Sequence, residues 1–274
     1  MKHTKKLAMS ISPLSLMAIL LFLGMTFTAH AYTFTSDFKN GFYWASFPIK
    51  MNKFAPVASD SALLEKLSNE AVAEWEAVIG KDIWEFTAVQ NTANYAGNFI
   101  RWSDNFGAET GYDPQRTLAI TIRYNSGTNF QQTVIILNGS IASLRQNWGN
   151  TLKTTILHEI GHTLGLDHSE DSGAVMAASL GAAVSLQSDD IEGVNAVVDE
   201  TSRRQSTGYV SPLSTSTSEK KVAACGTVED ISKNSGGSGG AMANFMGSLM
   251  VGLMLIVIVG KLERTRRQKG FVRY

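Results

Sequence analysis

The middle of the chain alternates apolar and polar positions with periods that predict a folded domain. From Ser61 to Ile79, apolar residues recur at spacings of three and four, and Asp60 or Ser61 can cap the segment. This spacing places the apolar side chains on one face, so the segment is predicted to be an amphipathic helix. Two more helices are predicted, from Leu152 to Leu164 and from Ser188 to Val198. The last one begins with acidic residues, which favour the positive end of the helix dipole.

Five shorter runs, rich in β-branched and aromatic residues, predict strands before and between these helices. Polar residues or glycines separate them. The runs are Phe47 to Met51, Trp84 to Val89, Asn98 to Trp102, Thr117 to Tyr124 and Thr133 to Asn138. Five strands and three helices predict an α+β domain, built as one mixed sheet with helices packed on it.

The first 31 residues have the pattern of a segment that directs export. Three lysines precede an apolar stretch from Leu14 to Phe27, and Ala29-His30-Ala31 follows. We expect residues 1–31 to be a signal peptide with an A-x-A cleavage site. An N-terminal membrane anchor is the alternative, but the apolar stretch is shorter than the roughly 20 residues that a spanning helix needs.

A second apolar stretch lies near the C-terminus. Residues 241–260 carry no charge and precede a basic segment, 261–274, so we expect a transmembrane helix followed by a cytoplasmic tail. The domain at residues 32–200 would then lie outside the cytoplasm. Between them, residues 201–240 are rich in Ser, Thr, Lys and Gly, which is typical of a flexible linker.

Composition narrows the classes of function. The 24 basic and 24 acidic residues balance, and no basic stripe crosses the middle of the chain, which argues against a nucleic-acid partner. Cys225 is the only cysteine, so the domain can have no internal disulfide. Its stability must therefore come from its core and from any bound metal.

The clearest motif of residues that can carry out chemistry is His158-Glu-Ile-Gly-His162, which is followed by Gly165 and His168. Two histidines four residues apart project from one face of a helix and can reach one metal ion. Gly165 can adopt the positive φ that ends the helix and turns His168 toward the same ion as a third ligand. The other two of the five histidines lie in the first 31 residues, so every histidine of the expected mature chain belongs to this segment.

Three neutral imidazoles leave one coordination position open, which is typical of a catalytic zinc site. Bound Zn2+ lowers the pKa of water from about 15.7 to roughly 7. Glu159, next to the first ligand, can take the proton from that water and pass it to a leaving amine. The pattern predicts a zinc endopeptidase that acts on a protein or peptide substrate, with Glu159 as general base.

The extended motif resembles that of the metzincin metalloproteases, and its surroundings resemble the matrixin family in particular. Ser169 directly follows the third histidine, and Ala174-Val-Met176 resembles the Met-turn of the family. The resemblance implies that Met176 lies beneath the zinc and that Gly165 and Met176 support the site. It extends over roughly Tyr32 to Val198 and implies a metzincin-like catalytic domain.

The chain also departs from the family pattern. Alanines stand where a proline follows the Met-turn methionine, and no histidine remains for a second, structural zinc. Ca2+ sites are compatible with the family but cannot be assigned to residues. No cysteine precedes the domain and the stretch after Tyr32 is short, so latency through a propeptide cysteine is not expected. The resemblance further implies that Thr117 to Tyr124 is the edge strand on which an extended substrate pairs.

The Gly-rich stretch, the apolar segment and the basic tail resemble bacterial C-terminal sorting signals of the Gly-Gly type. This resemblance implies a sorting protease as a partner, which would release the enzyme or anchor it again at the surface. A permanent membrane anchor remains the alternative. In both cases we expect an exported protein of the cell envelope or the cell exterior.

Two other functions fit parts of the pattern. A catalytically inactive zinc-binding module for surface adhesion fits the three histidines, but the intact Glu159 argues against it. An intramembrane protease fits the H-E-x-x-H motif. It is disfavoured because Lys153, Asp167 and Glu170 flank the motif, where such a protease would have long apolar spans.

Overall fold

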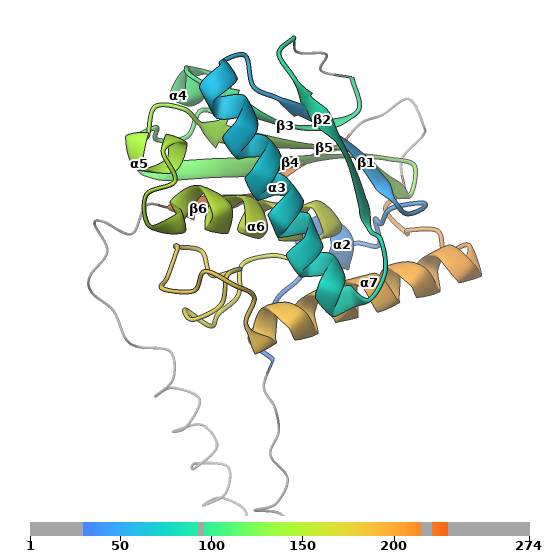
Figure 1. The fold of residues 1–274 in the computed structure, drawn as a ribbon. Helices are drawn as coiled ribbons and strands as arrows, with labels where there is room; N and C mark the ends of the chain where they lie inside the picture. Colours follow the sequence, from blue (N-terminus) through green and yellow to red (C-terminus); the bar gives the residue numbers. More distant parts are fainter. Residues whose placement is uncertain (1–29, 93–95, 215–220, 230–274) are drawn as a thin grey trace, which may run out of the picture. The chain divides into compact units, whose positions relative to one another are not determined.

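A mixed sheet organises the fold in the computed structural model, which describes residues 30–92, 96–214 and, for the backbone alone, 221–229. Within these residues the sheet has six strands in the order β2-β1-β3-β5-β4-β6 (Figure 1). They are β1 (Ile49–Phe54), β2 (Trp84–Gln90), β3 (Asn98–Ser103), β4 (Thr117–Ser126), β5 (Asn129–Asn138) and β6 (Lys221–Glu229). The first three strands and β5 run parallel, whereas β4 is antiparallel to both neighbours. The five predicted strands are present, and the predicted α+β class with a mixed sheet is confirmed.

The sixth strand changes the expected edge of the sheet. The sequence predicts β4 as the edge strand and residues 201–240 as a flexible linker, but β6 falls inside that range and pairs antiparallel with β4. A strand edge presents unpaired N–H and C=O groups, and a segment without proline can satisfy them. The Ser, Thr and Gly content of the whole range hides this short run of residues that can form a strand.

Three long helices lie among the described residues, and they correspond to the three predicted ones. The α-helices are α2 (Ser36–Lys39), α3 (Ala58–Ile79), α4 (Phe106–Thr110), α5 (Ala142–Arg145), α6 (Thr151–Leu164) and α7 (Ser188–Thr207), with a 3-10 turn, η1, at Trp148–Asn150. α7 continues beyond the predicted end at Val198, and the predicted domain boundary at residue 200 falls inside it. In this added part of α7, Arg204 is buried and donates to the carbonyl oxygens of Phe38 and Phe42. A search for apolar periodicity does not reveal such a contact.

Helices α3 and α6 pack against each other, α3 also against β2 and α6 against β4 (Figure 1). Trp75 of α3 is fully buried and donates its indole N–H to the carbonyl oxygen of Leu157 at 2.8 Å. Gly161 of α6 allows this close approach, since a Cβ there would lie 3.1 Å from Trp75 and 2.5 Å from the sulfur of Met176. The core thus fixes the helix that carries the first two histidines.

The predicted membrane and export segments fall outside the described residues. This applies to almost all of the signal peptide, 1–31, to the apolar stretch 241–260 and to the basic tail 261–274. In the ranges that the structure does describe, no helix combines the length and the apolar character needed to cross a membrane.

Candidate metal centre

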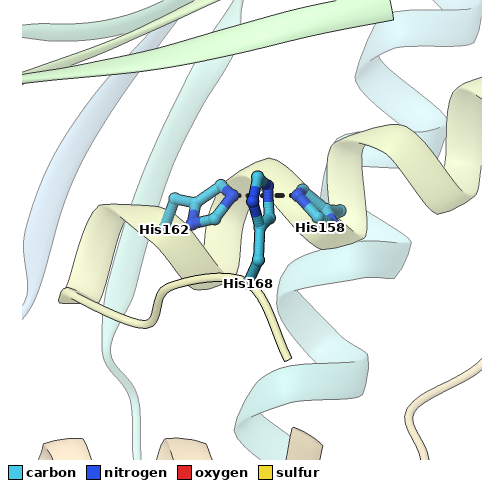
Figure 2. A group of neighbouring side chains, drawn as sticks. All are labelled: His158, His162 and His168. Carbon is cyan, nitrogen blue, oxygen red and sulfur yellow. Dashed lines mark hydrogen bonds between the residues drawn. The ribbon is translucent and has the colours of Figure 1, made fainter. Parts of the chain in front are cut away.

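α6 presents His158 and His162 one turn apart, and both side chains are fully buried. The helix ends where Gly165 adopts a φ of 107° and donates its N–H to the carbonyl oxygen of His162 at 3.1 Å. A Cβ at this position would lie 2.9 Å from Phe38, so backbone conformation and packing both require glycine. The chain then turns back and brings His168 to the other two histidines (Figure 2).

The three imidazole rings converge, with one ligand atom of each within 4.8 Å of the others (Figure 2). His158 Nδ1 lies 2.7 Å from the carbonyl oxygen of Val175, and His162 Nδ1 lies 2.7 Å from that of Leu166. A carbonyl oxygen can only accept, so each Nδ1 carries the hydrogen and each Nε2 presents a lone pair. The two Nε2 atoms are 2.8 Å apart. Lone pairs that face each other repel, and a shared cation removes the repulsion, so these donors fit a metal ion.

The protonation of the histidines also suits a metal. Burial, together with repulsion from His168, lowers the pKa of His158 to about 3. Burial and the other two histidines hold the pKa of His162 well below its usual value. Both imidazoles are therefore neutral at pH 7, the form that binds zinc. Among the described residues, this is the one group of three or more His, Cys, Asp or Glu side chains close enough to hold an ion. No cluster of acidic side chains in the same part of the chain supports a calcium site.

Glu159 is fully buried on α6, beside the first ligand. Its Oε2 accepts a hydrogen bond of 2.5 Å from the hydroxyl of Thr121, which lies on β4. Its Oε1 has no hydrogen-bond partner within the described part of the chain. Burial raises the pKa of Glu159 well above its usual value, although Thr121 and Arg123 act in the opposite direction. The unpaired oxygen is an acceptor that a bound water can satisfy.

Arg123, two residues further along β4, ties α6 to the N-terminal segment. One of its nitrogens, Nη1, donates to the carbonyl oxygen of His162 at 2.7 Å. Its Nε and Nη2 donate to the two carboxylate oxygens of Asp37 at 2.8 and 3.0 Å, and both side chains are buried. Sequence reasoning missed Thr121 and Arg123. The sequence contained a signal for Arg123, because a charged residue within an apolar strand needs a buried partner. It contained no such signal for Thr121.

The turn that contains Met176 is held by Asp190 of α7. Its carboxylate accepts the N–H groups of Val175 and Met176, each at 2.9 Å, and that of Gln187 at 2.8 Å. The same turn supplies the Val175 carbonyl that orients His158. Met176 is buried and lies against Gly161, beneath the helix of the site, although alanines follow it where the family has proline. Sequence reasoning identified the methionine but not Asp190, whose only signal was its place in the first turn of a helix.

The fold and the site together define the class of protein. A mixed sheet, a helix with two histidines, a glycine turn to a third histidine and a methionine turn beneath them are the parts of a metzincin. A family model described as matrixin matches residues 50–198, which is more than half of the 274 residues, and the chain belongs to the matrixin family. The resemblance predicted from the motif is thereby confirmed, and membership indicates a zinc metalloprotease.

One curated relative supports the same family over a short region. It is the "Putative matrix metalloproteinase" of Spodoptera frugiperda ascovirus 1a, with 44% identity over 63 residues. The similarity covers 20% of this chain and 16% of the viral protein, so it is confined to a small part of each.

Proposed function

We propose that the chain is a zinc-dependent endopeptidase that hydrolyses peptide bonds of extracellular or cell-envelope proteins. The observation that carries the proposal is the buried Glu159, whose Oε1 lacks a partner among the described residues and which lies beside the converging imidazoles. Zinc held by His158, His162 and His168 would supply Lewis-acid chemistry, polarising the scissile carbonyl and acidifying a water.

Glu159 would carry out the proton transfers of this reaction. Its Oε1 would accept a proton from the attacking water and pass it to the amide nitrogen that leaves. Thr121 would hold Oε2, so that Oε1 is the oxygen turned to the reacting groups. Burial raises the pKa of Glu159, which favours retention of the proton between the two transfers.

The test is casein hydrolysis by the full chain and by its Glu159→Ala variant, with the zinc content of both measured. Removal of a general base is expected to lower turnover by roughly 10²- to 10⁴-fold while zinc stays bound. Chelation should abolish the activity of the parent protein. Zinc in both proteins without hydrolysis of casein or of a peptide library would favour the alternative, an inactive zinc-binding module for adhesion.

Location is a second part of the proposal and rests on the sequence at both ends. We propose export through the signal peptide 1–31, with the domain outside the cytoplasm, and anchoring through 241–260 or processing by a sorting protease. Mass spectrometry of the mature chain tests both ends. A chain that retains residues 1–31 would contradict cleavage of a signal peptide, and loss of residues 241–274 would favour processing over a permanent anchor.

A further inference from the structure

The outer edge of β4 is covered by the chain's own C-terminal region. β6 runs antiparallel to β4 from the pair Asn125 and Lys221 to the pair Thr117 and Glu229. On its other side β4 pairs with β5, so both edges of β4 are engaged. α6, the helix of the metal centre, adjoins β4 and β6.

The outer edge of β4 lies close to Glu159, the proposed catalytic base. Thr121 of β4 bonds to Oε2 of Glu159, and the residue of β6 that pairs with Thr121 is Cys225. Any extended chain on this edge therefore runs level with Glu159 along the strand. Addition of a peptide strand to a sheet edge provides affinity through main-chain hydrogen bonds with little dependence on sequence. Such a mode suits an endopeptidase, whose substrate must lie extended across its site.

We infer that Lys221–Glu229, by pairing with the outer edge of β4, blocks within the same chain the edge on which an extended peptide substrate would pair. The segment and a peptide substrate then exclude each other. The inference rests on the proposed endopeptidase function and adds to it how access to the site is controlled. It concerns the backbone of β6 and requires no particular side chain.

One feature of the segment suits an occupant that can be displaced, and a second keeps it close to the edge of β4. The pairing of β4 with β6 shifts register twice, once between Thr117 and Ala119 and once between Ile120 and Thr121. Each shift interrupts the ladder of hydrogen bonds, and the second lies beside the residue that contacts Glu159. In addition, six residues, 215–220, join β6 to the preceding described segment. A short connection gives β6 an effective concentration on the order of millimolar.

The consequence for peptide binding is quantitative. A site that is open only part of the time binds with an apparent affinity reduced by the open fraction. Loss of β6 from the edge should therefore tighten binding of an added peptide and raise kcat/KM for peptide substrates, without any change at the histidines. A tenfold effect corresponds to about 1.4 kcal/mol of pairing.

The experiment weakens β6 in the full chain by the double substitution Ala223→Pro and Ala224→Pro. Adjacent residues of a strand direct their N–H groups to opposite edges, so one of the two prolines removes a donor that faces β4. The matched control, Ala223→Ser with Ala224→Ser, keeps both donors. The probe is a fluorescein-labelled nonapeptide with the sequence of residues 221–229 and serine at the position of Cys225. Its binding is measured by anisotropy, with Glu159→Ala present in every protein to prevent cleavage.

We expect the proline variant to bind the probe at least about tenfold more tightly than the parent and the serine control. Equal affinities for the three proteins would overturn the inference, and so would the absence of binding to all of them. Hydrolysis by the same proteins with Glu159 intact tests the proposed function separately. If the proline variant binds more tightly and none of the proteins hydrolyses any peptide, the endopeptidase proposal fails and the docking surface stands.

A second variant avoids any defect of folding caused by proline. Residues 216–219 are replaced with the recognition site of a sequence-specific protease, and the chain is cut there after purification. The cut removes the tether and lowers the effective concentration of β6. The cut protein should bind the probe about tenfold more tightly than the uncut protein, whereas an unchanged affinity would overturn the inference.

Discussion

Single buried polar groups decide how the reacting residues are oriented. The hydroxyl of Thr121 on β4 bonds to Oε2 of Glu159 and also lies 3.2 Å from the backbone carbonyl oxygen of Glu159, and both residues are fully buried. A buried carboxylate oxygen that loses its donor is left with the cost of its desolvation. The hydroxyl of Thr121 is therefore a positioning group for the proposed base.

Replacement of this hydroxyl gives the first prediction. Thr121→Val keeps the shape of the side chain but removes the donor, and kcat for a peptide substrate is expected to fall roughly 10- to 100-fold, as for other groups that orient a catalytic residue. KM and zinc content should change little, which steady-state kinetics and metal analysis can check. Thr121→Ser restores the hydroxyl and should recover most of the loss. A valine variant with full kcat would refute the positioning role.

The second prediction concerns the pH dependence of the ion pair between Asp37 and Arg123. Burial alone raises the pKa of Asp37, but attraction to Arg123 and hydrogen bonds from Arg123 and Thr35 outweigh burial and leave the pKa below its usual value of 3.8. As pH falls, Asp37 therefore binds its proton at a higher pH in the unfolded state than in the folded state. The stabilisation is fully present above the unfolded pKa and is lost as pH falls through the folded pKa.

Asp37→Asn should accordingly lower the free energy of unfolding most strongly near pH 7. Breaking a buried pair on one side typically costs about 3–5 kcal/mol. The difference between parent and variant should shrink as pH falls below about 4, where the unfolded aspartate becomes protonated. Urea unfolding of both proteins at pH 7 and pH 3 measures this. A difference that is equal at the two pH values would contradict the linkage.

At the scale of elements, the turn between the third histidine and α7 matters most. Asp190, in the first turn of α7, fixes Val175 and Met176, and Val175 in turn orients His158. The helix therefore acts on the metal through the turn and has no metal ligand of its own. A substitution at Asp190 should therefore change the affinity of the site for zinc.

The third prediction follows from this connection. Asp190→Ala should weaken zinc binding by roughly 10- to 100-fold, because the carbonyl that orients His158 loses its support. Competition with a chelator measures the affinity. Asp199→Ala is the matched control, since it removes an acidic residue from the exposed side of the same helix. Equal losses in the two variants would show that net charge, and not the turn, is responsible.

Elements with a strong internal pattern could be predicted from the sequence. The periodicity of α3 and the motif of α6 are local properties, and so is the glycine that ends α6. The end of α7 was missed although Gly208, which ends the helix with a φ of 61°, is a local signal, whereas the burial of Arg204 depends on carbonyl groups of residues far away in the chain. β6 could not be predicted, since its partner β4 lies about a hundred residues earlier. Thr121 and Asp190 were likewise missed, because their roles depend on contacts that only the fold creates.

For the molecule as a whole, α7 and the N-terminal segment stabilise each other. Arg204 donates to the carbonyl oxygens of Phe38 and Phe42, and its guanidinium lies 4.4 Å from the centre of the Phe38 ring. The same ring lies against Gly165, at the end of the helix of the site. The C-terminal part of α7 therefore supports the metal centre from a distance.

The fourth prediction compares two ends for the catalytic domain. A chain that stops at residue 200 lacks Arg204 and should lose about 2–5 kcal/mol in the free energy of unfolding relative to one that stops at residue 214. The buried carbonyl oxygen of Phe42 loses the donor that Arg204 provides, and that of Phe38 keeps only the N–H of Gly41. Arg204→Ala in the longer chain should reproduce much of the loss. Arg203→Ala, which removes an exposed neighbour, should not. Similar unfolding curves for both chain lengths would count against this role of α7.

Two of the three histidines owe their orientation to backbone carbonyl groups, those of Leu166 and Val175. A point mutation can replace either side chain, but it cannot delete a carbonyl oxygen. A substitution at either of these two positions therefore alters side-chain packing but leaves the backbone acceptor in place. Mutations can disrupt the metal centre mainly at its ligands and at the few side chains, such as Asp190, that hold the backbone in place.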